Sequence, residues 1–234
     1  MQTSEPGPTP RRLPRGRHAL SRAEVERVHR DRLCGAMAQA MAEKGYVGTS
    51  VEDVLKRARV SRQSFYALFS SKLDCFMAAF DQAGLLLFLQ LEAAMQGEAD
   101  AAGEGTAQGE ADAAGQGTAQ GDAAERFERV FTAYLEALAA EPAYARLFLV
   151  EVFAAGPEAV RRRTRVQRDL AASLADLMGV TSDSGRFACE VVVAAVSSMV
   201  TPAVAAGDME ALRAIRAPVI EHVRLLLRSG VMDG

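Results

Sequence analysis

The sequence predicts an all-α protein, in which an N-terminal three-helix domain with a helix-turn-helix precedes a larger C-terminal helical domain. Three observations support this fold class. Alanine and leucine dominate the 234-residue chain, aromatic residues make up 6% of it and tryptophan is absent, a composition that favours helices. Apolar residues recur at intervals of three and four, without the alternation of a β-strand. Serine residues with capping potential mark several of the expected helix starts.

The first 20 residues are predicted to form a disordered basic arm. They are rich in proline, arginine and glycine and contribute almost nothing to a core, so they cannot offset the entropy of ordering. Ordered structure is expected to begin at Ser21, which has the capping-box spacing to Glu24. Apolar residues then follow at helical spacing until Gly45, where we expect the first helix to end.

Two short helices and a long one are expected next. Ser50 and Asp53 repeat the capping-box spacing at the start of the second helix, and Ser61 is the expected cap of the third. Two short helices this close together, packed on a longer one, are typical of a helix-turn-helix, whose second helix enters the major groove of DNA. Residues 21–72 are therefore predicted to bind DNA, and residues 73–234 to form a second domain.

A tandem repeat interrupts the second domain. The sequence QGEADAAGEGTA occupies residues 96–107, and QGEADAAGQGTA follows at residues 108–119. Neither copy contains a large apolar side chain, and their glycines oppose a stable helix. The composition therefore predicts a flexible loop over residues 96–122.

Helical spacing resumes near Ala123 and continues towards the C-terminus. The last two expected helices contain Pro202 and Pro218 and should bend there, because proline lacks the N–H that a helix interior uses. Helices are expected through Phe127–Leu138 and over residues 142–155, 157–178, 184–206 and 208–229.

Charge divides the chain into a basic and an acidic part. Residues 1–72 carry 14 Lys and Arg against 7 Asp and Glu, whereas the remainder carries 13 against 23. This predicts an anionic partner for the N-terminal part, the alternative being a chance imbalance of solvated charges. The three cysteines are far apart, which fits a reducing compartment. We expect a cytoplasmic protein without membrane contact, because no apolar stretch reaches about 18 residues and no signal-peptide core is present.

Neither an enzyme nor a metal or cofactor site is predicted. His18, His29 and His222 lie far apart and lack metal-ligand spacing. The sequence contains no nucleophile elbow, phosphate-binding loop or dinucleotide fingerprint. The alternative to a DNA-binding protein is a helical protein-interaction module with a degenerate helix-turn-helix, and salt-sensitive DNA binding would separate the two.

The run GYVGTSVEDVLKRARVSRQSFYALFSSKLDCFMAAF resembles the DNA-binding segment of the TetR family of transcriptional regulators. Agreement extends over some 30 residues in order and without gaps. Most matching positions are small, capping or aromatic residues: Gly45, Tyr46, Thr49, Ser50, Val51, Asp53, Val54, Ala58, Val60, Ser61, Phe65, Tyr66, Phe69, Ser71 and Lys72.

The resemblance implies which residues meet DNA. Arg59 stands where the family usually has glycine, so a positive φ there would strain it, although its charge would add a phosphate contact. The plainer alternatives are a half-buried Tyr66 and a solvated Lys72. Phosphate contacts are implied for Thr49, Tyr66 and Lys72, groove contacts for Ser61, Arg62, Gln63 and Ser64, and Ser50 and Arg59 complete the DNA-binding candidates.

The resemblance also implies a homodimer on a palindromic double-stranded DNA operator and a small apolar or amphipathic effector bound in the C-terminal domain. Repression is the usual outcome in this family. Both sets of candidate residues have ordinary core as the alternative. The ligand-binding candidates are Phe127, Phe131, Tyr134, Phe148, Glu151, Phe153 and Met178. The dimer candidates are Val191, Val192, Ala195, Met199, Leu212, Ile215, Val219, Val223 and Leu227.

For the charged residues of the C-terminal domain, the sequence leaves open whether they are exposed or buried. Glu151 lies in an apolar run and is either exposed and paired with an arginine or buried against a ligand. Five arginines follow shortly after it and are predicted to form a solvated helix face. They are Arg161, Arg162, Arg163, Arg165 and Arg168.

Overall fold

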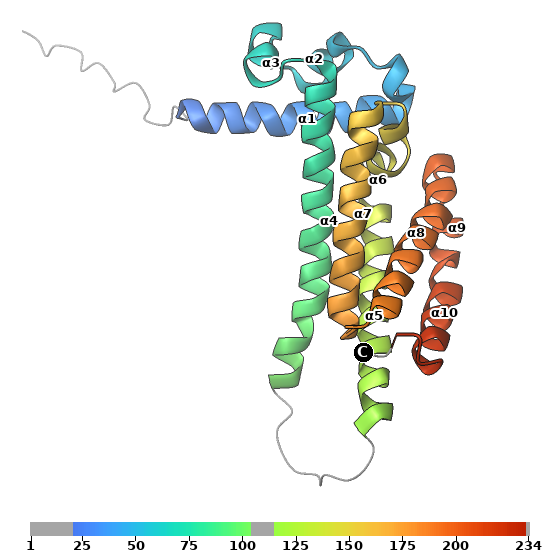
Figure 1. Cartoon of the computed structure of the whole chain (residues 1–234). Helices are drawn as coiled ribbons and strands as arrows, with labels where there is room; N and C mark the ends of the chain where they lie inside the picture. The colour runs from blue at the N-terminus through green and yellow to red at the C-terminus, as the bar shows by residue number, and fades with distance from the viewer. Residues whose placement is uncertain (1–20, 104–114, 233–234) are drawn as a thin grey trace, which may run out of the picture.

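The computed structural model describes residues 21–103 and 115–232, and its regular secondary structure is helical throughout that part of the chain (Figure 1). This confirms the predicted all-α fold class. One helix, α1, lies across an end of a bundle of long helices, with two short helices above it (Figure 1). The N-terminal domain comprises α1 (Arg22–Gly48), α2 (Val51–Ala58), α3 (Arg62–Leu68) and the start of α4 (Lys72–Gly103).

Capping and a glycine define the first helix. The Ser21 hydroxyl accepts from the Glu24 N–H and the Glu24 carboxylate accepts from the Ser21 N–H, so the predicted capping box is present. Gly45 has φ of 69° and interrupts the helical backbone, as its position in the sequence predicts. One further helical turn over residues 46–48 follows this kink and leads to α2.

The core of the N-terminal domain combines aliphatic and aromatic side chains. Phe65 of α3, Phe69 just after it and Phe76 of α4 belong to the same buried cluster as Leu33 and Met37 of α1. Because α1 packs on α2, α3 and α4, it fixes their relative positions. The two short helices are thus held on a rigid support.

The C-terminal domain is formed by the remainder of α4 and the helices that follow it. α4 packs on α5 and α6, and α7 packs on α5 and α8 (Figure 1). The helices are α5 (Gly115–Ala140), α6 (Pro142–Leu149), the 3₁₀ turn η1 (Glu151–Phe153), α7 (Pro157–Met178), α8 (Asp183–Ala206), α9 (Met209–Ala214) and α10 (Arg216–Arg228).

Three helix boundaries differ from the sequence expectations. The expected loop over residues 96–122 is helical at both ends, because α4 extends to Gly103 and α5 begins at Gly115; its middle lies outside the described residues. Alanines and flanking long helices favour such extension. The helix expected over residues 142–155 divides at Val150 into α6 and η1. The last one divides at Ile215, since Pro218 cannot donate to the carbonyl four residues earlier.

Among the described residues, two helices are long and apolar enough to cross a membrane by length and composition, namely α4 over Lys72–Met95 and α8. Neither contains an uninterrupted run of apolar residues long enough to span a bilayer, as the sequence predicts. Both helices also pack within the protein, α4 against α1, α5 and α6 and α8 against α6, α7 and α9. Core helices pass the same criterion, so their composition is accounted for by packing without a membrane.

Candidate DNA interface and ligand cavity

The helix-turn-helix consists of α2, a three-residue turn and α3. Ser50 caps α2: its hydroxyl accepts from the Asp53 N–H, and Asp53 accepts from the Ser50 N–H. A hydrogen bond from Lys44, together with those from Ser50, holds the pKa of Asp53 well below its ordinary value, so this cap stays ionised. Ser61 caps α3 by accepting from the Ser64 N–H at 3.0 Å.

Arg59 in the turn adopts the left-handed conformation, with φ of 54° and ψ of 45°. It is the only described non-glycine residue with positive φ. The strain expected from the sequence at this position is therefore present. Arg59 nevertheless ends α2 as a glycine would, because its N–H still bonds to the Leu55 carbonyl.

The first turn of α3 presents polar side chains to the surface. Arg62 and Gln63 are exposed, and Tyr66 is 51% exposed while its ring packs edge-on against Phe65. The hydroxyls of Ser61 and Ser64 share a hydrogen bond of 2.9 Å, which uses part of the hydrogen-bonding capacity of both side chains. α3 thus offers a guanidinium, an amide and a phenol on one short helix, all able to bond base edges or phosphates.

The basic residues around the turn fall into two groups. Lys44 and Arg57 pair with carboxylates of α2 and α1, and Lys56 pairs with Glu52. Arg59 and Arg62 are exposed and form no ion pair with any residue that the structure describes. Their charges are therefore available to a polyanion, whereas the paired residues mainly attach α2 to α1.

Two predicted phosphate contacts lie differently from the expectation. The Thr49 side chain is 2% exposed, and its hydroxyl donates inwards to the Gly45 carbonyl at 2.7 Å. The Lys72 ammonium donates to the Tyr46 and Thr49 carbonyls at 2.9 and 3.0 Å and lies 4.1 Å from the centroid of the Tyr46 ring. Burial lowers the pKa of Lys72. Both residues hold the turn between α1 and α2 in place.

An apolar cavity of about 110 Å³ lies between α5, α7 and α8. Four of the ligand-binding candidates line it together, namely Phe127, Phe131, Tyr134 and Phe148, and their role in binding a ligand stays a prediction. Stacked rings of Phe127 and Phe131, with centroids 5.5 Å apart, form part of its wall. The remaining walls come from Leu91, Val130, Leu149, Arg163, Gln167, Leu170, Leu174, Val192, Val193, Val196 and Ser197.

Arg163 is the residue that the sequence reading placed wrongly. It was expected on a solvated face with four other arginines, but it lines the cavity. Its spacing to Leu170 and Leu174, seven and eleven residues further on, puts it on the inner face of α7. That spacing is the signal that identifies it.

Three ligand-binding candidates lie outside the cavity. Met178 is buried in the core near the end of α7, and Phe153 is 55% exposed, with the Arg163 guanidinium 4.9 Å from its ring centroid. Glu151 is buried at the junction between the two domains. The predictions for these three residues as cavity lining are therefore wrong: Met178 is the last residue of α7, and Glu151 and Phe153 lie in η1, outside the cavity wall.

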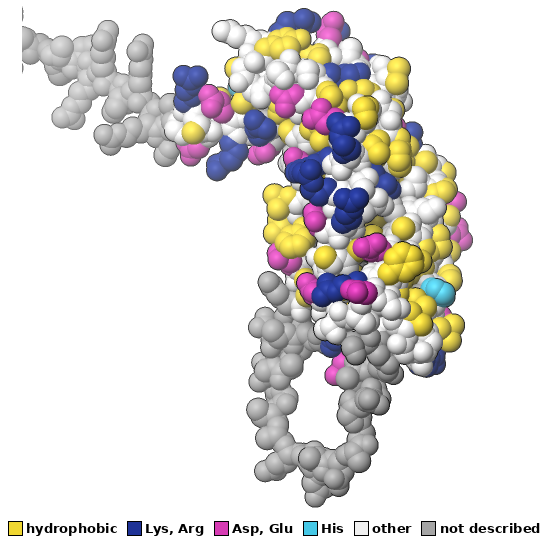
Figure 2. Space-filling model, viewed as in Figure 1, with side chains coloured by type: hydrophobic (Ala, Val, Ile, Leu, Met, Phe, Trp, Pro, Cys, Tyr) yellow, Lys and Arg dark blue, Asp and Glu magenta, His cyan; other side chains and the backbone are white. Residues whose placement is uncertain are grey.

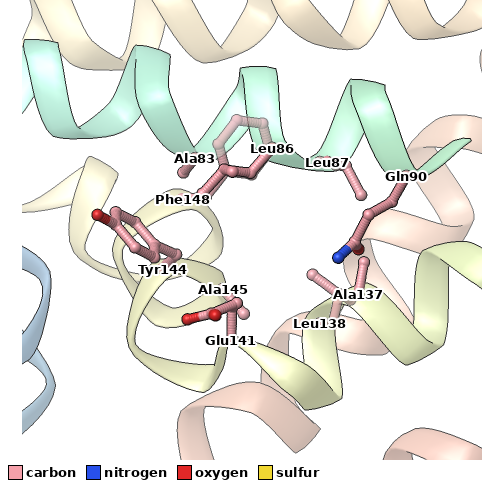
Figure 3. Close-up of a pocket in the computed structure, with 10 residues that line it drawn as sticks. All are labelled: Ala83, Leu86, Leu87, Gln90, Ala137, Leu138, Glu141, Tyr144, Ala145 and Phe148. Atoms are coloured by element: carbon pink, nitrogen blue, oxygen red, sulfur yellow. The ribbon is translucent and has the colours of Figure 1, made fainter. Parts of the chain in front are cut away.

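A second, smaller cavity of about 40 Å³ lies between α4, α5 and α6 (Figure 3). Its walls are mostly apolar, with Gln90, Glu141 and Tyr144 as the polar groups. Phe148 lines both this cavity and the larger one. Its ring stacks on that of Phe80, with centroids 4.6 Å apart.

Glu151 connects the two domains. Its carboxylate accepts from the Tyr46 N–H at 2.7 Å and pairs with Arg146 at 3.1 Å, so it is both buried and paired. A side chain on Gly45 would approach this carboxylate to 3.3 Å, which adds a second reason for glycine there. Arg146 in turn donates to the Ala205 carbonyl near the end of α8 at 2.7 Å. A chain of contacts thus runs from α8 through α6 and η1 to the N-terminal domain.

The dimer candidates divide between the surface and the core. On α10, Val219, Val223 and Leu227 are buried within the protomer, where α10 packs on α5, and Leu212 of α9 is fully buried. These residues, like the buried Val192, are not available to a second subunit, so this part of the prediction is wrong. Ile215 is partly buried against the same core.

The outer face of α8 is exposed and largely apolar. It includes the three other dimer candidates, Val191, Ala195 and Met199, together with Phe187, which is 66% exposed. These residues follow one another at intervals of four and therefore share one side of the helix. Figure 2 shows hydrophobic side chains gathered on the side of the molecule where α8, α9 and α10 lie in Figure 1. An exposed apolar face of this kind marks an interaction surface.

Within the described residues, no group of three or more His, Cys, Asp or Glu side chains is placed to hold a metal ion. Cys34, Cys75 and Cys189 are buried thiols without a disulfide partner. Burial raises the pKa of Cys34 to about 12, so this thiol stays protonated at neutral pH. These cysteines therefore behave as small apolar core residues.

Comparisons with known proteins agree with this geometry. Residues 35–79, which include α2 and α3, match the family model for bacterial regulatory proteins of the tetR family. No curated protein matches the chain. The fatty acid degradation regulator FadR of Bacillus halodurans is 20% identical, with a TM-score of 0.62 over 85% of this chain and 93% of that one.

Two further solved structures share the fold. FadR of Bacillus subtilis, in complex with stearoyl-CoA, is 18% identical, with a TM-score of 0.60 over 86% of this chain and 98% of that one. A TetR-family regulator of Agrobacterium tumefaciens is 19% identical, with a TM-score of 0.56 over 84% of this chain and 98% of that one. The similarity therefore covers both domains and not only the helix-turn-helix.

Proposed function

We propose that this chain is a DNA-binding transcriptional regulator of the TetR family and not an enzyme. In this proposal it is a cytoplasmic homodimeric repressor that leaves its operator when a small effector enters the α5–α7–α8 cavity. The observation that carries the proposal is the surface of α3. This helix offers Arg62, Gln63 and Tyr66 to solvent, while Phe65 on its other side is buried in the core.

The DNA contacts follow from exposure and charge. Arg62 and Gln63 are the proposed groove-facing residues, because arginine and glutamine bond bidentately to guanine and adenine edges. Arg59 and Tyr66 are the proposed phosphate contacts that flank them. The hydroxyls of Ser50 and Ser61 cap α2 and α3, and the Ser64 hydroxyl shares a hydrogen bond with that of Ser61. We therefore assign these three serines smaller contributions.

Lys72 and Thr49 act indirectly in this proposal. Their hydrogen bonds hold the turn over residues 45–49, which sets the position of α2 on α1. The Lys72 ammonium uses two of its three donors on carbonyls, leaving one for a phosphate. DNA binding thus depends on these residues mainly through the geometry that they impose.

Dimerisation is proposed through the outer face of α8. A palindromic operator requires two-fold symmetry, and a symmetric interface places the same patch on both subunits. Phe187, Val191, Ala195 and Met199 offer an exposed stripe with small residues between large ones. Leu225 of α10 is 54% exposed and extends the apolar surface beyond α8.

An apolar or amphipathic effector is proposed for the cavity. Aromatic and branched side chains supply nearly all of its lining, which suits a ligand with an apolar body. FadR of Bacillus subtilis, which shares the fold, was solved with stearoyl-CoA, a ligand of this amphipathic kind. The proposal takes from that protein only the class of ligand.

The route from cavity to DNA is proposed to run through Arg146 and Glu151. α8 lines the cavity with Val192, Val193 and Val196, and its last turn bonds to Arg146. A ligand that displaces α8 changes this contact and hence the Glu151 contact to Tyr46, where the DNA-binding domain begins to turn. Such a ligand shifts the population away from the spacing that fits DNA.

The proposal is tested by footprinting the protein on the DNA that flanks its own gene. A dimeric repressor protects a palindromic site whose half-sites lie about one helical turn apart, roughly 34–36 Å. Analytical ultracentrifugation should show two protomers per protected site. Absence of any protected site, or protection by one protomer, would contradict the proposal.

A further inference from the structure

The cavity between α5, α7 and α8 contains a charge. Of the described residues that line it, Arg163 alone is ionisable to a cation or anion at neutral pH. The other polar groups are the neutral Tyr134, Gln167 and Ser197. A guanidinium on the wall of an otherwise apolar space requires an explanation, because desolvating a charge is costly unless it is paired.

The hydrogen bonds of Arg163 account for only part of its donors. One terminal nitrogen donates to Gln167 at 3.1 Å and the other to the Ser197 hydroxyl at 2.6 Å. The Nε group is buried and has no hydrogen-bond partner. No ion pair between described residues includes Arg163, whereas Arg162 beside it pairs with Asp81. Its positive charge is therefore uncompensated by any carboxylate in the described part of the chain.

A purely structural role explains less than the whole arrangement. Arg163 connects α7 to α8 through Ser197 and lies over the Phe153 ring at 4.9 Å. A neutral side chain such as glutamine would make a similar link to Ser197 without bringing a charge out of water. The unused Nε–H and the missing counter-charge remain unaccounted for.

We infer that the effector is an amphipathic molecule whose anionic head group, a carboxylate or a phosphate, binds Arg163 while its apolar part lies among Phe127, Phe131 and Phe148. The inference rests on the proposed function and names the ligand class of that site. A planar guanidinium matches carboxylate and phosphate oxygens bidentately, so one anion satisfies both the charge and the free donor.

Tyr134 supplies a second donor to the same head group. Burial raises the pKa of Tyr134, so its phenol stays protonated and can donate to an anion. Burial also lowers the pKa of Arg163, yet a guanidinium stays charged at neutral pH. The cavity wall thus carries a cation and a neutral donor, which is the combination that favours an anion over a neutral or cationic ligand.

The size of the cavity sets how the apolar part is accommodated. At about 110 Å³ it is smaller than the roughly 300 Å³ or more of typical ligand sites. A long chain must therefore move side chains as it enters. Phe148 is the wall shared with the smaller cavity, so its displacement would join the two spaces into one longer tunnel.

The test is calorimetric binding of decanoate, decyl phosphate, decan-1-ol and decylammonium to the full chain, all below their micellar concentrations. Wild type should bind an anionic probe at least about tenfold more tightly than the alcohol, and the ammonium least, as expected for one charged hydrogen bond. Arg163→Met should remove that preference. Arg163→Lys should retain part of it, and Arg168→Met, at an exposed arginine of α7, should leave it unchanged.

Head-group discrimination separates a ligand contact from a structural role. If Arg163→Met only loosens α7 and α8, it weakens all four probes alike, and the inference fails. It fails equally if wild type binds decan-1-ol as tightly as the anions, or binds neither anion. The arms with decanoate and decyl phosphate distinguish a carboxylate from a phosphate ligand.

The same samples distinguish this failure from that of the proposed function. A dimer that binds its operator but does not discriminate head groups overturns only the ligand class. Protein that binds neither an operator nor any probe overturns the proposed function itself. Thermal unfolding of Arg163→Met and Arg163→Lys identifies any variant that does not fold. If Arg163→Met does not fold, Arg163→Lys, which retains the positive charge, still tests the head-group preference.

Discussion

The DNA-binding domain and the C-terminal domain hold their functional side chains in opposite ways. On α3, Arg62 and Gln63 project into solvent, and the helix beneath them is fixed by the Ser61 cap and by an apolar core that includes Phe65. In the C-terminal domain, the partly buried Arg163 and Tyr134 line a cavity whose walls come from several long helices. The first arrangement presents fixed chemistry outwards, and the second encloses a space that a ligand must remodel.

This difference separates affinity for DNA from its regulation. Exposed residues on α3 change DNA contacts without affecting the core, whereas cavity residues lie against helices that lead to the domain junction. Glu151 belongs to both systems, because it bonds to Tyr46 of one domain and Arg146 of the other. Substitutions in the two regions should therefore have separable effects on DNA binding, stability and ligand response.

The largest effect is expected from Val191→Asp on the outer face of α8. A carboxylate in an apolar two-fold interface meets its own copy and should dissociate the dimer. A protomer on its own contacts only one half-site of the operator, so operator binding should weaken about 100-fold or more. Analytical ultracentrifugation and fluorescence anisotropy measure both quantities. Leu85→Asp, at an exposed leucine of α4, is the matched control and should leave the dimer intact.

The next largest effect is expected from Arg62→Ala. Removing a bidentate base contact should cost about 1–3 kcal/mol of operator binding, or roughly 5- to 150-fold in Kd. Its unfolding midpoint should match wild type, since Arg62 is exposed and unpaired among the described residues. Arg168→Ala serves as the control for charge alone. Equal losses for the two variants would argue against a groove contact.

Lys72→Met tests whether Lys72 acts on the fold or on DNA. The Tyr46 and Thr49 carbonyls lose a charged donor, so the free energy of unfolding should fall by about 1–3 kcal/mol. Urea denaturation measures the change. Lys56→Met removes an exposed ion pair with Glu52 and should cost less than about 1 kcal/mol. Unchanged stability of Lys72→Met with weakened DNA binding would assign the residue to phosphate contact alone.

Glu151→Gln tests the junction between the domains. The substitution retains an acceptor for the Tyr46 N–H but removes the charge that pairs with Arg146. Stability should fall by about 1–2 kcal/mol, and operator affinity should change severalfold although the residue is remote from α3. Glu158→Gln, on the exposed first turn of α7, should change neither. A stability loss without any effect on DNA affinity would remove Glu151 from the proposed route.

The smallest effect is expected from Arg59→Gly. Glycine adopts the left-handed conformation of the turn without the cost that arginine incurs, so stability should rise by about 1 kcal/mol. DNA affinity should fall modestly. The slope of log affinity against log salt concentration should become less steep by about 0.9, the amount that corresponds to one phosphate contact. Chemical denaturation and a salt titration measure the two changes. A stability gain with unchanged salt dependence would show that Arg59 does not reach DNA.

The N-terminal domain was largely predictable because its signals are local. Ser21 with Glu24 and Ser50 with Asp53 form capping boxes within three residues of sequence, and Gly45 ends a helix by its own backbone freedom. The inward hydrogen bonds of Thr49 and Lys72 were not predictable, because they depend on carbonyls up to 26 residues away. A motif gives residue types and spacing but not which way each side chain turns.

The C-terminal domain was predictable in composition but not in orientation. Helical spacing identified its helices and four aromatic cavity residues, yet the apolar stripe of α10 faces its own core on α5 and not a second subunit. Periodicity identifies a buried face without saying what buries it. The same ambiguity hid Arg163, whose position shows only once its spacing is compared with Leu170 and Leu174 on α7.

The most direct test of the account is operator binding by wild type, Arg62→Ala and Arg163→Met, measured by fluorescence anisotropy across a salt series. The account predicts that wild type prefers one flanking site over random DNA, that affinity falls steeply with salt, and that Arg62→Ala loses the preference while Arg163→Met keeps it. Equal binding of wild type to flanking and random DNA, or an unaltered preference in Arg62→Ala, would contradict it.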